Sequence, residues 1–253
     1  MIGFRLPREM ICETLLQDYF KNFDFLEIKI GDSISDSELE ELIRLLLKDT
    51  KFAKFSLHLP KNSLYDLEQY ETCIKILKRI AKYKIKQINL VVHFVFYDST
   101  IIKRIVYLVS ILKEQETLLI ENICQFSKNN KYISELEDAL KIVDSLNLGF
   151  CMDWGHYLFG TSKEGVEQGK AIDILLNHTE LIKKIRELHI HDFNQQRDHL
   201  TIGTGNMKID LIFKKLSINV PVIIETTVKN PKKDGIDQVM SIQTARSKAY
   251  ANS

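Results

Sequence analysis

The stretch LGFCMDWGHYLFG, residues 148–160, places a short apolar run directly before Asp153 and His156. Seven other runs of this kind are spread along the chain: IGFRL (2–6), FLEIKI (25–30), KFSLHLP (54–60), INLVVHF (88–94), TLLIENI (117–123), RELHIHD (186–192) and VPVIIETT (220–227). Their interiors are almost continuously apolar and do not alternate with polar residues, which is typical of parallel strands covered on both faces. The sequence therefore predicts eight strands of a parallel sheet.

Segments with a helical period separate these strands. In SDSELEELIRLLLKD, residues 35–49, apolar residues share one face, and Ser35 and Glu38 have the spacing of a capping box. Other helices are expected around residues 8–21, 66–82, 99–115, 133–147, 166–184, 208–216 and 236–250, and loops around 61–66, 157–168 and 193–208. Eight alternations of strand and helix predict one (β/α)8 barrel domain over residues 1–253. An open nucleotide-binding sheet is less suited, because no GxGxxG or GxxxxGK[ST] follows an early strand.

The composition is that of a soluble globular protein. Hydrophobic residues make up 45% of the chain, which is enough for a sizeable core. The formal net charge of +1 gives no general attraction to nucleic acid or acidic membranes. The N-terminal segment interrupts its apolar residues with Arg5, Pro7 and Arg8, unlike a secretory signal, and no apolar run is long enough to cross a bilayer. We expect a cytoplasmic protein whose four scattered cysteines are reduced core thiols.

Polar residues at the strand ends carry the functional prediction, because chemistry in such barrels takes place at the carboxyl ends of the strands. Six successive predicted strands end in an imidazole or a carboxylate: His58, His93, Glu121, Asp153 with His156, His189 with His191, and Glu225. Burying three carboxylates near one axis without a cation would be costly. Imidazole and carboxylate without convergent thiolates suit a divalent ion such as Zn, Mn, Co or Mg.

Seven motifs, SLHLP, VVHF, LIENI, CMDWGH, LHIHD, HLTIGTG and VIIETT, together resemble the xylose isomerase-like barrels. That family includes sugar isomerases and epimerases, dehydratases and endonuclease IV. The resemblance implies a metal tetrad of Glu121, Asp153, His189 and Glu225. It also implies additional metal or substrate ligands, matching the histidines with which endonuclease IV binds its second and third zinc ions: His58, His93, His156 and His199. The chain departs from the nuclease at Arg197, which stands where the nuclease has aspartate, with Asp198 shifted by one residue.

The resemblance implies three alternative activities. The first is an isomerase, epimerase or related lyase acting on a small sugar-like hydroxy-carbonyl compound, in which Glu121 and Glu225 exchange a proton and a metal ion stabilises an enediolate. The second is a zinc phosphodiesterase that acts at abasic sites in DNA. The third is an accessory barrel enzyme or binding protein of a biosynthetic pathway. Arg197, and the absence of HPG after VVHF, favour the first, so a small molecule is the expected partner and nucleic acid the alternative.

Several residues near the strand ends are expected to assist. Trp154 would stack on a sugar face, and Lys29, Arg5 and Arg197 would hold a phosphate or carboxylate, although packing and ordinary ion pairs are the structural alternatives. His191 and Asp192 are expected to orient His189 from behind. The glycines of GTG, residues 203–205, are expected to permit a tight turn at the barrel mouth.

Overall fold

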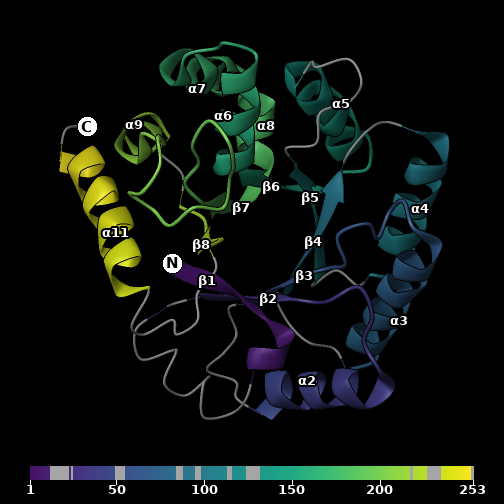
Figure 1. Ribbon diagram of the computed structural model, residues 1–253. Helices are drawn as coiled ribbons and strands as arrows, with labels where there is room; N and C mark the ends of the chain where they lie inside the picture. Colours follow the sequence, from purple (N-terminus) through teal and green to yellow (C-terminus); the bar gives the residue numbers. More distant parts are fainter. Residues whose placement is uncertain are drawn as a thin grey trace.

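The computed structural model describes residues 1–11, 23, 25–48, 55–83, 88–94, 98–112, 116–123, 132–216, 219–226 and 235–251. Its strands form a closed parallel barrel, in which each strand pairs with its neighbours in the sequence and the first pairs with the last (Figure 1). The strands are β1 (Ile2–Pro7), β2 (Phe25–Lys29), β3 (Phe55–His58), β4 (Ile88–Phe94), β5 (Glu116–Asn122), β6 (Gly149–Asp153), β7 (Ile185–Ile190) and β8 (Val222–Ile224). The predicted (β/α)8 barrel is confirmed.

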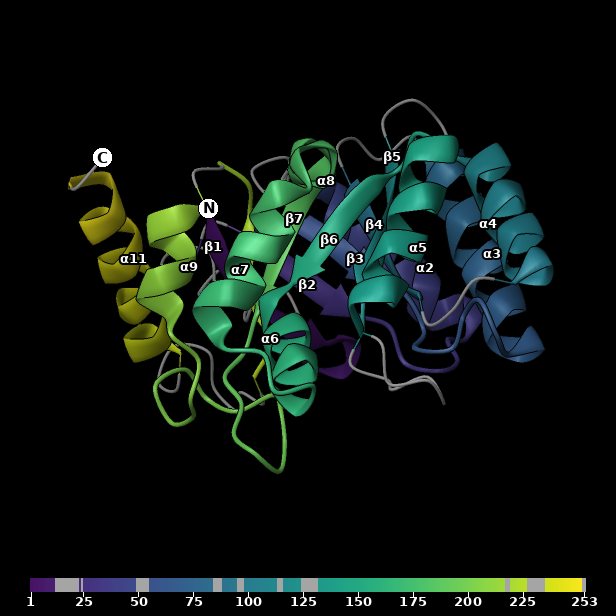
Figure 2. The same cartoon turned by 90° about the horizontal axis from the view of Figure 1, so that it is seen from above.

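Helices lie around the outside of the barrel (Figures 1 and 2). They are α2 (Asp36–Lys48), α3 (Leu67–Tyr83), α4 (Ser99–Ile111), α5 (Tyr132–Ser145), α6 (Trp154–Lys163), α7 (Gln168–Asn177), α8 (Thr179–Lys184), α9 (Ile209–Lys215) and α11 (Ile236–Ala251). Of the helix expected over residues 8–21, the short 3-10 helix η1 (Arg8–Met10) is seen, and residues 12–21 lie outside the described residues. No helix in the described part of the chain is both long and apolar enough to span a membrane.

The two faces of the barrel strands differ in chemistry. Residues that pair in register point to the same face, so Glu27, Ser56 and Asn89 share the inward face of β2, β3 and β4. Intervening residues such as Leu57 and Leu90 belong to the large core beneath the helices. The barrel interior is therefore partly polar below the strand ends. This is unusual, because bulky apolar side chains normally fill the interior of such a barrel.

Helix starts follow local side-chain chemistry. The capping box at α2 is confirmed: the Ser35 backbone N–H donates to Glu38 Oε2 at 2.8 Å, and the Glu38 N–H lies 3.3 Å from Ser35 Oγ. The loop expected around residues 157–168 is shorter, residues 164–167, because α6 begins at Trp154 directly after β6 and continues to Lys163. The helix expected over 166–184 is two helices, α7 and α8, separated at His178, whose ψ of 69° is not helical.

Candidate metal centre

Side chains from β3 to β8 meet at the end of the barrel where the strands terminate. His93 pairs in register with Glu121, and Asp153 pairs with His189, so each pair points to one face. One ligand atom from each of four buried residues lies within 4.8 Å of the others: Glu121, Asp153, His189 and Glu225. The structure thus brings together the residues predicted as a metal tetrad.

Glu121 joins this tetrad to two further histidines. Its Oε2 lies 2.9 Å from Nε2 of His58 and 3.1 Å from Nε2 of His93. His58 Nδ1 lies 3.1 Å from the Leu59 carbonyl oxygen, so both ring nitrogens face acceptors; with Nδ1 donating to the carbonyl, Nε2 presents a lone pair to Glu121. Burial lowers the pKa of His58 to about 4, so its imidazole is neutral at neutral pH. A lone pair facing a buried carboxylate is unfavourable unless a cation lies between them.

Asp153 is the N-cap residue of α6, which explains the D-x-x-H pattern. Its Oδ1 accepts the backbone N–H of His156 at 2.7 Å, as an N-cap aspartate does. The Asn122 amide bonds both backbone groups of Asp153, at 2.8 and 2.9 Å, and so fixes the end of β6. Asp153 Oδ2 accepts no hydrogen bond from any described residue, although it is buried. One carboxylate oxygen is therefore held by the helix, and the other is available to a ligand.

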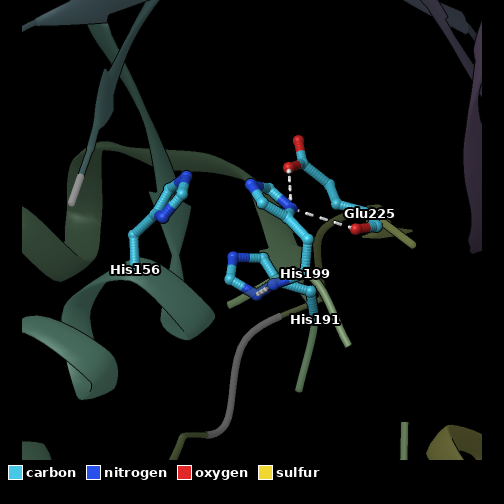
Figure 3. A group of neighbouring side chains, drawn as sticks. All are labelled: His156, His191, His199 and Glu225. Carbon is cyan, nitrogen blue, oxygen red and sulfur yellow. Dashed lines mark hydrogen bonds and ion pairs between the residues drawn. The ribbon is translucent and has the colours of Figure 1, made fainter. Parts of the chain in front are cut away.

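His156 and His191, which lie 3.6 and 3.2 Å from Asp153 oxygens, belong to a further group of side chains with His199 and Glu225 (Figure 3). His199 has a φ of 53°, and its Nδ1 lies 3.1 Å from the Glu225 carbonyl oxygen, so Nδ1 carries the proton and Nε2 is the free acceptor. His156 Nδ1 lies 3.3 Å from Oδ2 of Asp198. Although Arg197 replaces the aspartate expected in a nuclease, Asp198 still brings a carboxylate to this position.

Negative charge accumulates in the buried part of the site. Five carboxylate residues are buried there: Glu27, Glu121, Asp153, Glu187 and Glu225. Burial by itself raises the pKa of the Glu121 carboxyl, but the positive charge of His189 holds that pKa well below its usual value. So many buried carboxylates need cations, and ligand groups that mix histidine and carboxylate fit divalent ions of the zinc class.

Two of these carboxylates, Glu27 and Glu187, were not predicted from the sequence. Nε2 of His189 lies 3.0 Å from Glu27 Oε2 and 3.2 Å from Glu187 Oε1. Nδ1 of the same ring lies 2.9 Å from Glu121 Oε1 and 2.7 Å from Glu225 Oε1. The only sequence signal was that Glu187 stands two residues before His189, and hence on the same face of β7.

His191 and Asp192, which were expected to orient His189, contact other groups. The Asp192 carboxylate accepts four backbone N–H groups at 2.8–2.9 Å, those of Phe193, Gly203, Gly205 and Met207. The N–H groups of Gly203 and Gly205 in the GTG segment are thus taken up by Asp192. Gly203 has a φ of 88°, and a Cβ on Gly205 would overlap Asp192, so the segment is a tight turn built around one carboxylate.

Two predicted substrate contacts are engaged inside the protein. Arg5 Nε lies 3.0 Å from Glu27 Oε1, and the same guanidinium pairs with Glu225, so Arg5 forms the barrel-end ion pair. Trp154 is fully buried and packs edge-on against Tyr157, with ring centroids 6.0 Å apart. Both side chains support the site from within, and this packing does not favour direct contact of Trp154 with a sugar.

The other two predicted substrate contacts are exposed. Lys29 ends β2 in register with His58, so its side chain stands at the same mouth of the barrel. Desolvation, followed by the positive charges of Arg5 and Lys61, lowers the pKa of its amine, which indicates a small cluster of cations. Arg197 closes a turn in which the Asn194 N–H donates to its carbonyl oxygen at 2.9 Å. Both cations remain predictions for binding an anionic group.

Comparison with known proteins places the chain. KGPDC from Streptococcus mutans in complex with D-R5P superposes with a TM-score of 0.54, at 10% sequence identity and over 98% of both chains. DHPS from Yersinia pestis, with a pterine-sulfa conjugate, gives a TM-score of 0.42 at 11% identity, covering 98% of this chain and 93% of that one. At such identity the first likeness shows a shared fold alone. No curated protein matches the sequence. The family model of the xylose isomerase-like TIM barrel matches residues 22–245, and the chain therefore belongs to this family.

Proposed function

We propose that this protein is a metal-dependent hydrolase of phosphate esters. Its centre would bind two or three divalent ions, and zinc is the ion that these ligands fit best. The observation that carries the proposal is the pair of imidazole nitrogens, Nε2 of His58 and Nε2 of His93, that face the same Glu121 oxygen at 2.9 and 3.1 Å. A single ion held by the tetrad would use neither of these nitrogens as a ligand. Two ions that share Glu121 would use both sets of ligands.

The residues divide into overlapping ligand groups. The first group is His58, His93 and Glu121, and the second is Glu121, Asp153, His189 and Glu225. A third group would combine His156 and His199 with the carboxylate of Asp198 or Glu225. The unpartnered Asp153 Oδ2 and the protonated Nδ1 of His58 and His199 support this assignment, because each leaves an acceptor for an ion.

Ions bound there would supply Lewis acidity toward a phosphoryl oxygen and a nucleophilic water at neutral pH. The chain's own residues would do the rest. Arg5 holds Glu225 in place through their ion pair. Lys29 and Arg197, at the mouth, would attract and orient a phosphate group, and the buried carboxylates and histidines exclude bulk water from the reacting atoms.

An isomerase or epimerase of a sugar-like hydroxy-carbonyl compound is the second candidate. The observation that favours it is the approach of two carboxylates, Glu121 and Glu225, to the same nitrogen of His189 at 2.9 and 2.7 Å. With one ion in the tetrad, these two glutamates would stand on two sides of a substrate and exchange its proton. His58 and His93 would then bind substrate hydroxyl groups.

Activity assays on the zinc-loaded and manganese-loaded protein separate the two candidates. The substrates are a set of phosphomonoesters and phosphodiesters that includes an abasic-site duplex, and a set of ketoses and keto-inositols. His93→Ala is the informative variant, and His178→Ala is its control, because His178 lies between α7 and α8 and caps neither with its side chain.

We expect zinc-dependent ester hydrolysis that falls at least about 100-fold in His93→Ala and is unchanged in His178→Ala. Turnover of a keto sugar by a one-ion protein that tolerates His93→Ala would instead establish the isomerase. Hydrolysis that persists after complete removal of metal would contradict both candidates.

A further inference from the structure

The protonation of His191 can be read from one hydrogen bond. The backbone N–H of His199 donates to His191 Nδ1 at 2.9 Å, a shorter contact than the 3.3 Å between this nitrogen and the Asp192 carbonyl oxygen. Because a backbone amide always carries its hydrogen, Nδ1 must be the unprotonated nitrogen, and the proton of the neutral ring is on Nε2. This tautomer is the reverse of that assigned to His58 and His199, whose Nδ1 atoms face carbonyl oxygens and accept no backbone N–H.

Asp153 is within reach of that Nε2 proton. His191 Nε2 lies 3.2 Å from Asp153 Oδ1, and both side chains are completely buried. A buried N–H requires an acceptor, and Oδ1 already accepts the N–H of His156. Neither His191 Nε2 nor Asp153 Oδ2 has an aligned hydrogen-bond partner among the described residues, so Oδ1 at 3.2 Å is the acceptor in reach of the Nε2 proton, and Oδ2 remains open to a ligand.

The chain provides a dedicated space for this imidazole. A Cβ on Gly155, the second residue of α6, would overlap three atoms of the His191 ring. On the other side the ring stacks on His199, with centroids 4.1 Å apart and planes 30° apart (Figure 3). His191 is thus clamped between the first turn of α6 and the loop after β7, which lie at the same end of the barrel (Figure 2).

We propose that His191 is a positioning residue and not a metal ligand: its Nε2–H holds Asp153 Oδ1, and its Nδ1 holds the backbone of His199. The inference rests on the proposed metal centre, in which Asp153 is a ligand through Oδ2. His191 would then connect a ligand at the end of β6 with the loop that carries His199, so that the second and third ligand groups keep a fixed geometry relative to each other.

The first test is the protonation state of the histidine nitrogens in protein labelled with 15N-histidine, measured by two-bond 15N–1H correlation before and after zinc is added. The His191 resonances are assigned by their loss in His191→Gln. We expect an unprotonated Nδ1 and a protonated Nε2 in both states, and the reverse tautomer for His58. Coordination of zinc by His191 Nε2, seen as loss of its proton on zinc addition, would overturn the proposal.

The second test uses two substitutions that each keep one of the two contacts. His191→Gln places an amide N–H near the position of Nε2, and His191→Asn places an amide oxygen near that of Nδ1. A positioning role predicts that both variants bind as many zinc ions as the unmodified protein, while His191→Leu weakens zinc binding by about 10–100-fold. Loss of one zinc equivalent in both amide variants would show that His191 is a ligand.

The two tests distinguish a failure of this inference from a failure of the proposed function. If the unmodified protein binds no zinc, the metal centre is wrong, whereas the tautomer of His191 still decides the contacts with Asp153 and His199. If zinc binds as expected but Nε2 of His191 loses its proton, the positioning role alone fails. His178→Gln, at a site between α7 and α8, is the control for any general effect of losing an imidazole.

Discussion

Nε2 of His189 lies 3.0 Å from Oε2 of Glu27, while the other ring nitrogen faces the carboxylates of the candidate metal centre. A carboxylate behind a histidine fixes its tautomer and raises its basicity as a ligand. Burial by itself raises the pKa of Glu27, but the charges of His189 and Arg5 lower it to about 2, so this carboxylate stays ionised. Glu187 contacts the same nitrogen, Nε2 of His189. Burial raises the pKa of Glu187, so it holds a proton more readily than Glu27 does.

Replacing Glu27 and replacing Glu187 should therefore weaken zinc binding to different extents. Glu27→Gln removes the ionised partner of His189 and is expected to weaken zinc binding by about 10–100-fold. Glu187→Gln replaces a group that is easily protonated by a neutral one of the same shape, and should weaken binding less. Competition with a coloured chelator measures both affinities, with exposed Glu180→Gln as control. Equal losses in the two site variants would contradict this division of roles.

Asp192 is expected to control the loop that carries His199. Asp192→Asn leaves one acceptor oxygen and turns an NH2 group toward backbone N–H donors, so two of its four hydrogen bonds are lost. The free energy of unfolding should fall by roughly 2–4 kcal/mol. Limited proteolysis should cut within residues 193–207 earlier than in the unmodified protein. Asp210→Asn, an exposed change in α9, serves as control, and an uncut loop in Asp192→Asn would count against the account.

The capping box of α2 predicts a pH dependence. Hydrogen bonds from the Ser35 side chain and backbone lower the pKa of Glu38 from 4.5 to about 2. A carboxyl with a depressed pKa stabilises the folded state fully above its unfolded pKa and loses that contribution as the pH falls toward its folded pKa. The melting temperature of Glu38→Gln should therefore lie below that of the unmodified protein at pH 6, and the difference should shrink toward pH 3. A constant difference would argue against ionised Glu38 as the cause.

The thiols of Cys73 and Cys151 are expected to be unreactive in the folded protein. Both are buried, and burial raises the pKa of each, so little thiolate is present and reagents cannot reach it. Peptide mapping after iodoacetamide treatment should find these two residues modified only when denaturant is present. Rapid labelling of Cys151 in the native protein would mean that the barrel interior beneath the centre is open.

The barrel was predictable because each of its strands coincides with an apolar run, and these runs recur at a regular spacing. The helix α6 was missed for a physical reason: its residues Trp154–Thr161 are all buried, so no polar face marks a helical period. It also follows β6 without a loop, since Asp153 is both the last strand residue and the helix cap. A helix without an exposed face gives no alternation of apolar and polar residues from which it could be predicted.

The strand-end residues were predictable because each stands alone at the end of an apolar run. Their partners were not. Glu27 reads as one polar residue inside a strand, and only the closed barrel brings it to His189 from across the interior. His191 and Asp192 were recognised as supporting groups, but their contacts depend on how the chain returns after β7, with Asp192 and Leu200 bridged in antiparallel fashion. Long-range pairing of this kind is set by the loop and cannot be read from spacing.

The number of metal ions bound per chain decides between a centre of several ions that share Glu121 and a one-ion tetrad. Elemental analysis should be made on protein purified without chelators and without a metal-binding tag, in parallel with the His93→Ala variant. We expect two to three equivalents of zinc per chain, and one fewer in His93→Ala. A single equivalent of any divalent ion that is unaffected by His93→Ala would contradict the shared role of Glu121 and leave the one-ion isomerase. No bound metal, and no change in melting temperature when divalent ions are added, would contradict the metal centre altogether.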